Sequence, residues 1–370
     1  MDALILTCST GGGHNAAAYA VKEELIRRGE RVTLLNPYGL YSKKLEKGID
    51  RSYVSLVKNL PHCFGWLYKL GEFYRKLPFP SPIYWLNGKM VRVMENYLRQ
   101  NHFDVIIMTH IFPGQIMAHM KARGIKLPKT ILIATDYVCI PFSEETDCDA
   151  YIIPSHSLMS EFKNKGIPEK RIYPLGIPVR SAFTCQGSKR ISRKRLGINN
   201  FVKFILISGG SIGAGKLERV VKLLYERCST DIEIAVICGD NKRLYDRLSK
   251  KYGNAIRVIQ NTDRIADYMR SSDIYLTKPG GLSSTEAAVM GIPLVHLPAI
   301  PGCETKNAEF FYQNGMSLRV KGTKIDMLQV LNFMENSSKC NEMREQQRKG
   351  IPYHATSKIC ELIIDMARSV

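Results

Sequence analysis

The sequence predicts an α/β protein built from two open, doubly wound parallel sheets. Eight short runs are rich in Val and Ile and apolar along their whole length, which is typical of strands buried on both faces of a parallel sheet. Helical spacing of apolar residues follows the runs. They fall into two sets and cover residues 3–9, 105–110, 131–136, 150–155, 204–210, 232–239, 273–280 and 293–297. A chain of 370 residues is long enough for two domains of ordinary size.

The two sets of strands are separated by a basic stretch over residues 176–197, where hydrophobic periodicity stops. We therefore predict a first domain over 1–178, a linker over 179–194 and a second domain over 195–350. The tail, 351–370, has the apolar spacing of a closing helix. In doubly wound sheets, ligands bind beyond the carboxyl ends of the strands. The active site is therefore expected in the cleft between the two domains.

Charge and cysteine usage narrow the choice of partner and compartment. The formal net charge of +19 indicates an acidic partner: nucleic acid, an anionic membrane surface or a phosphate-bearing substrate. The ten cysteines are scattered, without Cys-x-x-Cys pairs, which predicts reduced thiols in the cytosol. The chain lacks a cationic leader and any apolar run of about 18 residues. We expect a protein that is neither exported nor integral to a membrane.

A glycine-rich loop, GGGH, follows the first predicted strand. Gly12 and Gly13 at a strand-to-helix junction allow backbone to approach a ligand, and the helix that follows directs amide donors into the same space. His14 ends this run and is a candidate for positioning or deprotonating a reacting hydroxyl. The alternative is that His14 is only a hydrogen-bonding residue at the start of a helix.

A second glycine-rich loop, GGSIGAGK, opens the second half. It nearly matches the Walker A loop, but Leu217 stands where that motif needs a hydroxyl for magnesium. The G-x-G-x-x-G spacing of dinucleotide-binding loops is also absent. The loop still places glycines before a helix N-terminus, an arrangement that suits a diphosphate. The alternative is a tight turn that binds no ligand.

A third loop, TKPGGLSSTEA, strengthens the diphosphate interpretation. Lys278 and the amides of the next helix suit phosphates, while Ser283, Ser284 and Thr285 offer hydroxyls and N-capping groups. Glu286 can accept both hydrogen bonds of a ribose diol; otherwise it only complements the helix dipole.

The series GGGH, TDY, GGSIGA, TKPGGLSSTEA and PGCETKNAEFF resembles the GT-B glycosyltransferases of the family 28 type. These include monogalactosyldiacylglycerol synthases and processive diacylglycerol glucosyltransferases. The resemblance covers nearly the whole chain, with the motifs in family order. It implies two facing Rossmann-like domains, with the acceptor on the first and a UDP-sugar on the second. It also implies that the closing helix, 351–370, packs back on the first domain.

The resemblance implies roles for individual residues on both domains. Relatives commonly carry glutamine where this chain has Cys303, beside the residues that would face the donor sugar. On the acceptor side, Gly12 and Gly13 are joined by His110 and Gln115, from a segment like the family's His-Pro-x-x-x-Gln with Ile111 in place of proline. The donor-binding residues would be Gly209, Gly210, Ser211, Gly213, Ala214, Lys278, Gly280, Gly281, Leu282 and Ser283 for the diphosphate, Glu286 for the ribose, Asn261 and Thr262 for the uracil, and Glu304 and Asn307 for the sugar.

Glycosyl transfer needs a base for the acceptor hydroxyl and stabilisation of the departing diphosphate. Asp136 ends the strand 131–136, where an open sheet presents its chemistry, and relatives place a catalytic or acceptor-binding aspartate there. Asp136 is therefore the predicted base, with His14 as the alternative. The only Asp-x-Asp sequence, at 147–149, precedes a strand and is interpreted as a solvated turn. We expect no metal and no cofactor beyond the UDP-sugar donor.

Residues 41–99 contain both tryptophans and many cations. Leu45, Ile49, Tyr53, Leu56 and Leu60 fall on one helical stripe, with Lys47, Arg51 and Lys58 opposite. Aromatic anchors and cations of this kind suit an anionic membrane interface. We predict a cytoplasmic enzyme bound to the inner face of the cell membrane, with a lipid acceptor such as diacylglycerol. The membrane residues would be Trp66, Tyr68, Phe73 and Trp85.

Two rival functions remain open at this point. A soluble GT-B relative, such as a UDP-N-acetylglucosamine 2-epimerase or a transferase to another acceptor, needs no lipid surface. A non-enzymatic basic module would use its charge for nucleic acid or act as a sensor. The intact GGSIGA and KPGGLSSTE loops argue against such a module, and we expect no nucleic-acid partner.

Overall fold

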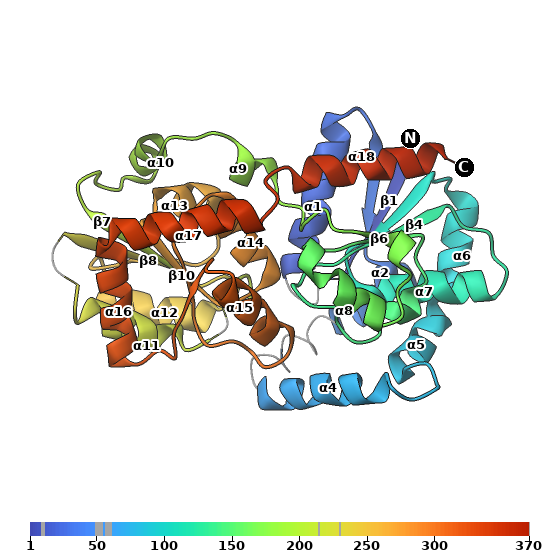
Figure 1. Ribbon diagram of the computed structural model, residues 1–370, viewed down its shortest axis with the longest axis horizontal. Coiled ribbons are helices and arrows are strands. Elements are labelled where there is room, and N and C mark those ends of the chain that lie inside the picture. Colours follow the sequence, from blue (N-terminus) through green and yellow to red (C-terminus); the bar gives the residue numbers. More distant parts are fainter. Residues whose placement is uncertain (9–11, 49–54, 56–60, 214, 229–230, 370) are drawn as a thin grey trace. The chain divides into compact units, whose positions relative to one another are not determined.

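The computed structural model describes residues 1–8, 12–48, 55, 61–213, 215–228 and 231–369 (Figure 1). Two compact units are present. The first comprises Met1–Ser181, Pro301–Cys303 and His354–Val370, and the second comprises Ala182–Ile300 and Glu304–Tyr353. Each unit contains a six-stranded parallel sheet, which confirms the predicted fold class.

The sheet of the first unit has the order β2-β1-β3-β4-β5-β6. Its four inner strands coincide with predicted apolar runs, and the register places Ile5 opposite Ile107 and Ile107 opposite Ile131. The backbone pairs of all six strands are parallel, so their carboxyl ends share one edge of the sheet. The strands are β1 (Asp2–Leu6), β2 (Arg31–Leu35), β3 (Val105–Met108), β4 (Lys129–Ile133), β5 (Ala150–Ile152) and β6 (Ile172–Tyr173).

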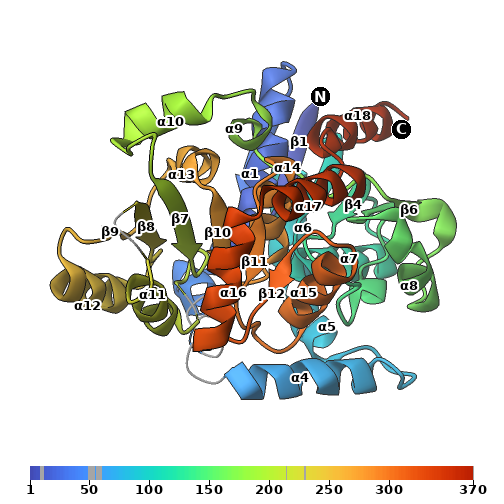
Figure 2. The same cartoon turned by 60° about the vertical axis from the view of Figure 1, so that its left-hand side comes forward.

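Helices cover both faces of this sheet because its strands are apolar on both faces. Leu4 and Leu6 join one core cluster, while Ala3 and Ile5 join another on the opposite face. Helix α18 packs in the second cluster and lies beside α1, as Figures 1 and 2 both show. The helices are α1 (Gly12–Arg27), α2 (Pro37–Tyr41), α4 (Pro61–Tyr74), α5 (Pro82–Asn87), α6 (Val91–Gln100), α7 (Ile111–Ala122), α8 (Met159–Asn164) and α18 (Ala355–Arg368), with 3-10 turns η1 (Gly88–Met90), η2 (Ser143–Thr146), η3 (His156–Leu158) and η4 (Glu169–Arg171).

The sheet of the second unit has the order β12-β11-β10-β7-β8-β9. Its strands are β7 (Lys203–Ser208), β8 (Ile232–Ile237), β9 (Arg257–Ile259), β10 (Ile274–Thr277), β11 (Leu294–His296) and β12 (Leu318–Arg319). Its helices are α9 (Ser181–Thr184, which begins at the unit boundary), α10 (Lys189–Leu196), α11 (Leu217–Tyr225), α12 (Lys242–Tyr252), α13 (Ile265–Ser271), α14 (Gly281–Val289), α15 (Cys303–Gln313), α16 (Lys324–Glu335) and α17 (Ser337–Gly350).

The structure differs from the predicted linker over 179–194. The boundary between the units falls after Ser181, and helix α10 packs beside α13 within the second unit (Figures 1 and 2). Arg193 is only 3% exposed; its guanidinium donates to the Ser271 carbonyl at 3.0 Å and pairs with Asp273 at 2.8 Å. Arg193 is therefore a buried cation within a basic helix, and Asp273 neutralises its charge.

Candidate active site

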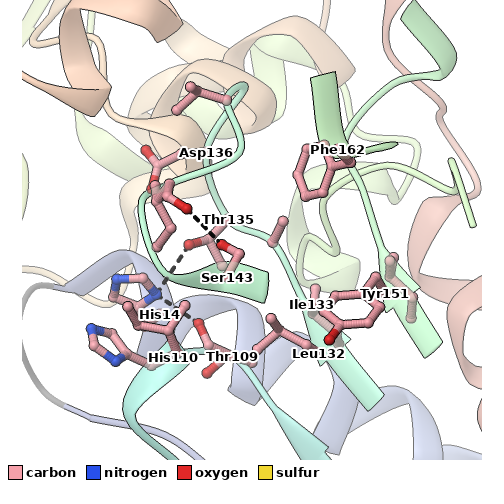
Figure 3. A pocket seen from close by; sticks show the side chains of 15 residues that line it. His14, Thr109, His110, Leu132, Ile133, Thr135, Asp136, Ser143, Tyr151 and Phe162 are labelled. Atoms are coloured by element: carbon pink, nitrogen blue, oxygen red, sulfur yellow. Dashed lines mark hydrogen bonds between the residues drawn. The ribbon is translucent and has the colours of Figure 1, made fainter. Parts of the chain in front are cut away.

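A small pocket opens where β3 and β4 of the first unit end (Figure 3). Thr109 and His110 follow β3, Thr135 and Asp136 follow β4, and His14 reaches the pocket from the first turn of α1. Its volume is about 20 Å³, enough for a group the size of one water or hydroxyl. The structure thus brings together both predicted catalytic residues and one of the predicted acceptor-binding residues.

Two hydrogen bonds hold the His14 ring through its Nδ1 atom. Nδ1 lies 2.7 Å from the Thr109 carbonyl oxygen and 3.0 Å from the Thr135 hydroxyl, as the dashed lines in Figure 3 show. A carbonyl oxygen can only accept, so Nδ1 carries a hydrogen and, in the neutral ring, Nε2 carries the lone pair. Burial lowers the pKa of His14, while the charge of Asp136 raises it and only partly offsets the effect of burial. His14 is therefore a neutral imidazole near pH 7, as a general base must be.

His110 has the opposite tautomer. It is the N-cap residue of α7, and its Nδ1 accepts a hydrogen bond from the Phe112 amide at 3.1 Å. In the neutral ring the hydrogen is therefore on Nε2. The ring packs edge-on against His14, with 4.6 Å between centroids, and burial together with His14 holds the pKa of His110 well below its usual range. His14 Nε2 therefore has a lone pair that can accept the proton of a hydroxyl, and His110 Nε2 has an N–H that can donate to a hydroxyl oxygen.

Gly12, Gly13 and Gln115 are the other residues predicted to bind the acceptor, and none of them is among the residues that line the pocket. Gly12 and Gly13 form the first turn of α1, directly before His14, and Gly11 lies outside the described residues. Gln115 is fully buried and does not line the pocket. Its amide accepts from Asn87 and donates to Glu145, each at 2.6 Å, and so joins α7 to α5 and η2. The sequence did not indicate this network, because its members are far apart along the chain.

The carboxyl edge of the second sheet gathers the predicted donor-binding loops. Gly210 and Gly213, between β7 and α11, have φ angles of 69° and 58°. A Cβ at Gly213 would lie 2.0 Å from the Cys238 carbonyl oxygen, and one at Gly210 would lie 2.7 Å from Cε of Lys278. Both positions need glycine to fit the protein itself. Gly209 is buried and Ser211 exposed, while Ala214 lies outside the described residues.

The loop after β10 leads directly into α14. Gly280 is the N-cap residue and has no side chain, so it leaves the first amides of α14 without a side-chain cap. Ser284 and Thr285 do not serve as caps, contrary to expectation: Ser284 Oγ lies 2.9 Å from His296 Nε2, and Thr285 donates back to the Gly281 carbonyl. The helix also places Gly281, Leu282 and Glu286 in buried positions and Ser283 in a half-buried one.

Two side chains predicted to face the sugar contact the loop after β10. Glu304, in the first turn of α15, pairs with Lys278 at 2.5 Å. Asn307, one turn later, is fully buried and donates to the Pro279 carbonyl at 3.1 Å. Cys303, which begins α15, is half-buried. Asn261 is exposed and Thr262 half-buried before α13; Asn261 Nδ2 donates to Asp240 at 3.2 Å.

The aromatic segment of the first unit divides into an exposed and an enclosed part. Trp66, Phe73 and Trp85 are 65%, 64% and 61% exposed. Tyr68 does not share that surface: its hydroxyl is enclosed, without a hydrogen-bond partner among the described residues. Leu45 and Lys47 lie in the helical turn at 43–48, while Ile49, Arg51, Tyr53, Leu56, Lys58 and Leu60 lie outside the described residues. Within the described ranges, no helix has both the length and the apolar character needed to span a bilayer.

The carboxylates of the Asp-x-Asp sequence have protein partners. Asp147 pairs with Arg171 at 2.7 Å, and Asp149 accepts from Thr130 and lies 3.1 Å from Lys121. Over the part of the chain that the structure describes, no three His, Cys, Asp or Glu side chains converge as metal ligands would.

Comparison with known proteins identifies the kind of enzyme. Residues 14–179 match the family model of monogalactosyldiacylglycerol (MGDG) synthase, and residues 204–357 match that of the glycosyltransferase family 28 C-terminal domain. The chain is a GT-B glycosyltransferase. Its relatives include the processive diacylglycerol beta-glucosyltransferases of Bacillus pumilus, 24% identical over 98% of this chain and 94% of the relative, and of Bacillus licheniformis, 26% identical over 92% and 89%.

Solved structures support the fold of this glycosyltransferase. MurG of Acinetobacter baumannii superimposes with a TM-score of 0.63 at 16% identity, covering 98% of this chain and 99% of MurG. UDP-GlcNAc 2-epimerase of Neisseria meningitidis gives 0.64 at 11% identity, covering 99% of this chain and the whole of the epimerase. At these identities the likeness shows the GT-B fold alone.

Proposed function

We propose that this glycosyltransferase moves a hexose from a UDP-sugar to a lipid acceptor of the diacylglycerol type, at a membrane surface and without a metal ion. The observation that carries the proposal is the hydrogen bond from His14 Nδ1 to the Thr109 carbonyl. It leaves a neutral, half-buried imidazole whose Nε2 carries a lone pair, on a ring that lines a pocket with room for a hydroxyl. A hydroxyl must lose its proton to attack a sugar, and the pocket contains a base for that step.

The roles of the pocket residues follow from their chemistry. His14 Nε2 takes the proton of the acceptor hydroxyl and becomes an imidazolium. The negative charge of Asp136, which raises the pKa of His14, stabilises that imidazolium as it forms. His110 Nε2–H is a donor that can hold the oxygen of the same hydroxyl. This assignment makes His14 the base and Asp136 its electrostatic support.

The donor side supplies cationic and amide groups for the diphosphate. The uncapped amides at the start of α14, the backbone of the glycine loop after β7 and the Lys278 ammonium lie at one edge of the second sheet. Groups of this kind stabilise the charge that develops on a departing diphosphate. The proposed reaction therefore needs no metal ion to neutralise the leaving group.

The lipid acceptor is supported by the surface of the first unit and by the relatives. Trp66, Phe73 and Trp85 expose most of their surface to solvent, and Lys69 and Lys89 follow Trp66 and Trp85 closely along the chain. Exposed aromatic side chains among cations suit a membrane interface that contains anionic lipid. The relatives' names specify diacylglycerol as acceptor and glucose as the transferred sugar. We propose the same acceptor and give UDP-glucose precedence among donors.

The products test this proposal directly. The purified enzyme is incubated with UDP-glucose, UDP-galactose or UDP-N-acetylglucosamine and with anionic vesicles that contain diacylglycerol, and the lipid extract is analysed by mass spectrometry. One donor is expected to give a glycosylated diacylglycerol. Interconversion of UDP-N-acetylglucosamine with its 2-epimer, without any glycolipid, would contradict the proposal and favour an epimerase.

A further inference from the structure

Two residues expected to bind opposite parts of the donor bind each other. Lys278 follows β10 and is expected at the diphosphate, whereas Glu304 begins α15 and is expected at the sugar. The Lys278 Nζ atom lies 2.5 Å from Glu304 Oε1, and the other carboxylate oxygen accepts a hydrogen bond from the Ile300 amide at 3.1 Å. A donor that contacts both residues therefore meets an ion pair that is already formed.

The surroundings make this ion pair stronger than one on the surface. Glu304 is only 8% exposed, and the Lys278 side chain crosses directly over Gly210, where a Cβ would lie 2.7 Å from its Cε. The pair thus lies against the glycine loop that is expected to receive the diphosphate. Attraction between partly buried charges is screened less than in bulk water, so separating them has a real cost.

We infer that Glu304 competes with the donor's diphosphate for Lys278 and releases it fully only to a complete nucleotide sugar. The inference rests on the proposed function, because it assumes a UDP-sugar at this edge of the second sheet. UDP alone would bind Lys278. The Glu304 carboxylate would then lie near two phosphates and would gain no new hydrogen-bond partner. A UDP-sugar supplies hydroxyl donors to the displaced carboxylate, so only the complete donor satisfies both residues.

The same competition favours release of the product. When the sugar has left for the acceptor, Glu304 loses its hydroxyl partners while UDP remains at Lys278. The carboxylate then repels the diphosphate and competes again for the ammonium. Glu304 therefore acts as a specificity residue that lowers the affinity for UDP relative to the UDP-sugar and limits product inhibition.

UDP binding to four forms of the protein tests this inference: wild type, Glu304→Gln, Lys278→Met and the double variant, measured by titration calorimetry. Removing the Glu304 charge is expected to tighten UDP binding about fivefold, because UDP no longer competes with one ion pair for Lys278. In the Lys278→Met background the same change should have little effect, because there is no ammonium left to compete for. Glu309→Gln is the matched control: it removes one charge from the same helix, where Glu309 pairs with Lys306 at the surface.

Two results would overturn the inference: unchanged or weaker UDP binding by a folded Glu304→Gln protein, or equal tightening in the Lys278→Met background. Glu304→Asp is the second variant, since its shorter side chain retains the charge but loses reach to Lys278; intermediate tightening is expected. Failure of the proposed function is distinguishable. If Glu304→Gln tightens UDP as expected but no glycolipid forms, the competition stands and the acceptor is wrong.

Discussion

The His14 ring is held by a carbonyl that can only accept and by a hydroxyl that can do both. The tautomer of His14 therefore depends on the Thr109 backbone and not on any neighbour that titrates. Sequence reasoning found His14, His110 and Asp136 as separate strand-end or loop residues. It could not find the tautomers, because Thr109 is 95 residues from His14 along the chain and contributes a backbone oxygen.

The dependence of rate on pH distinguishes the two candidate bases. His14 is active only when neutral, and burial lowers its pKa, so kcat/KM should stay level below the ordinary value of about 6.5 and fall at more acidic pH. Asp136→Asn removes a charge that raises this pKa, so the acidic limb should move to lower pH. A pH profile of kcat/KM measures both. If Asp136→Asn abolishes the acidic limb altogether, Asp136 is the base.

Replacement of His14 itself gives an independent prediction. His14→Gln is expected to reduce kcat/KM by about 10² to 10⁴, the usual contribution of a general base. Affinity for UDP should not change, because the donor loops belong to the second unit. Steady-state kinetics and UDP calorimetry on the same preparation check the two parts. Activity close to wild type would remove His14 from the mechanism.

At the scale of elements, the four strands that sequence reasoning missed, β2, β6, β9 and β12, are the four edge strands. The eight that it found are the inner strands. An inner strand of a doubly wound sheet is buried on both faces and reads as an unbroken apolar run. β2, β9 and β12 instead contain Arg31, Arg257 and Arg319, and β6 has only two residues. The predicted linker, 179–194, includes most of helix α10, which packs within the second unit although its sequence is strongly basic.

Helix α10 depends on Asp273, which pairs with both Arg193 and Lys189. Burial acts to raise the pKa of Asp273, but the hydrogen bond and charge of Lys189 outweigh it and the pKa is lowered. Asp273→Asn leaves the buried Arg193 guanidinium without its counter-charge and is expected to cost roughly 3 kcal/mol of stability. Urea unfolding measures this loss. Asp246→Asn, which breaks the exposed pair with Lys242, should change stability little, and an equal loss there would contradict the account.

Helix α4 makes the membrane prediction testable. Trp66→Ala combined with Phe73→Ala removes two aromatic side chains that are mostly exposed, so folding should be unaffected. Binding to anionic vesicles is expected to weaken at least about tenfold, because each ring contributes apolar area at the interface. Co-sedimentation with vesicles is the measurement. Phe201→Ala is the control, since Phe201 is 96% exposed on the second unit; equal weakening there would make the effect nonspecific.

At the scale of the whole molecule, the residues predicted to act on the acceptor and those predicted to bind the donor belong to separate units. The first unit holds the His14 pocket and the exposed aromatic side chains of α4 and α5, and the second holds the glycine-rich loops after β7 and β10, Lys278 and Glu286. Sequence motifs predicted this division because each motif is local to a strand end. They did not predict contacts between motifs, such as the Lys278–Glu304 pair, because spacing along the chain carries no distances.

This division predicts that donor binding and membrane binding can be lost independently. Glu286→Ala should weaken UDP affinity about tenfold or more, because it removes the carboxylate expected at the ribose diol. Vesicle co-sedimentation by the same variant should match wild type. Loss of both properties together would indicate that Glu286 supports the fold and does not contact the donor.

UDP release from a UDP-sugar, with anionic vesicles that contain or lack diacylglycerol, tests whether this enzyme glycosylates a lipid with His14 as its base. A coupled assay would compare wild type with His14→Gln under both conditions. Release should require diacylglycerol and should be largely lost in the His14 variant. Release at the same rate without diacylglycerol, or unchanged by His14→Gln, would contradict a lipid glycosyltransferase that uses this histidine as its base.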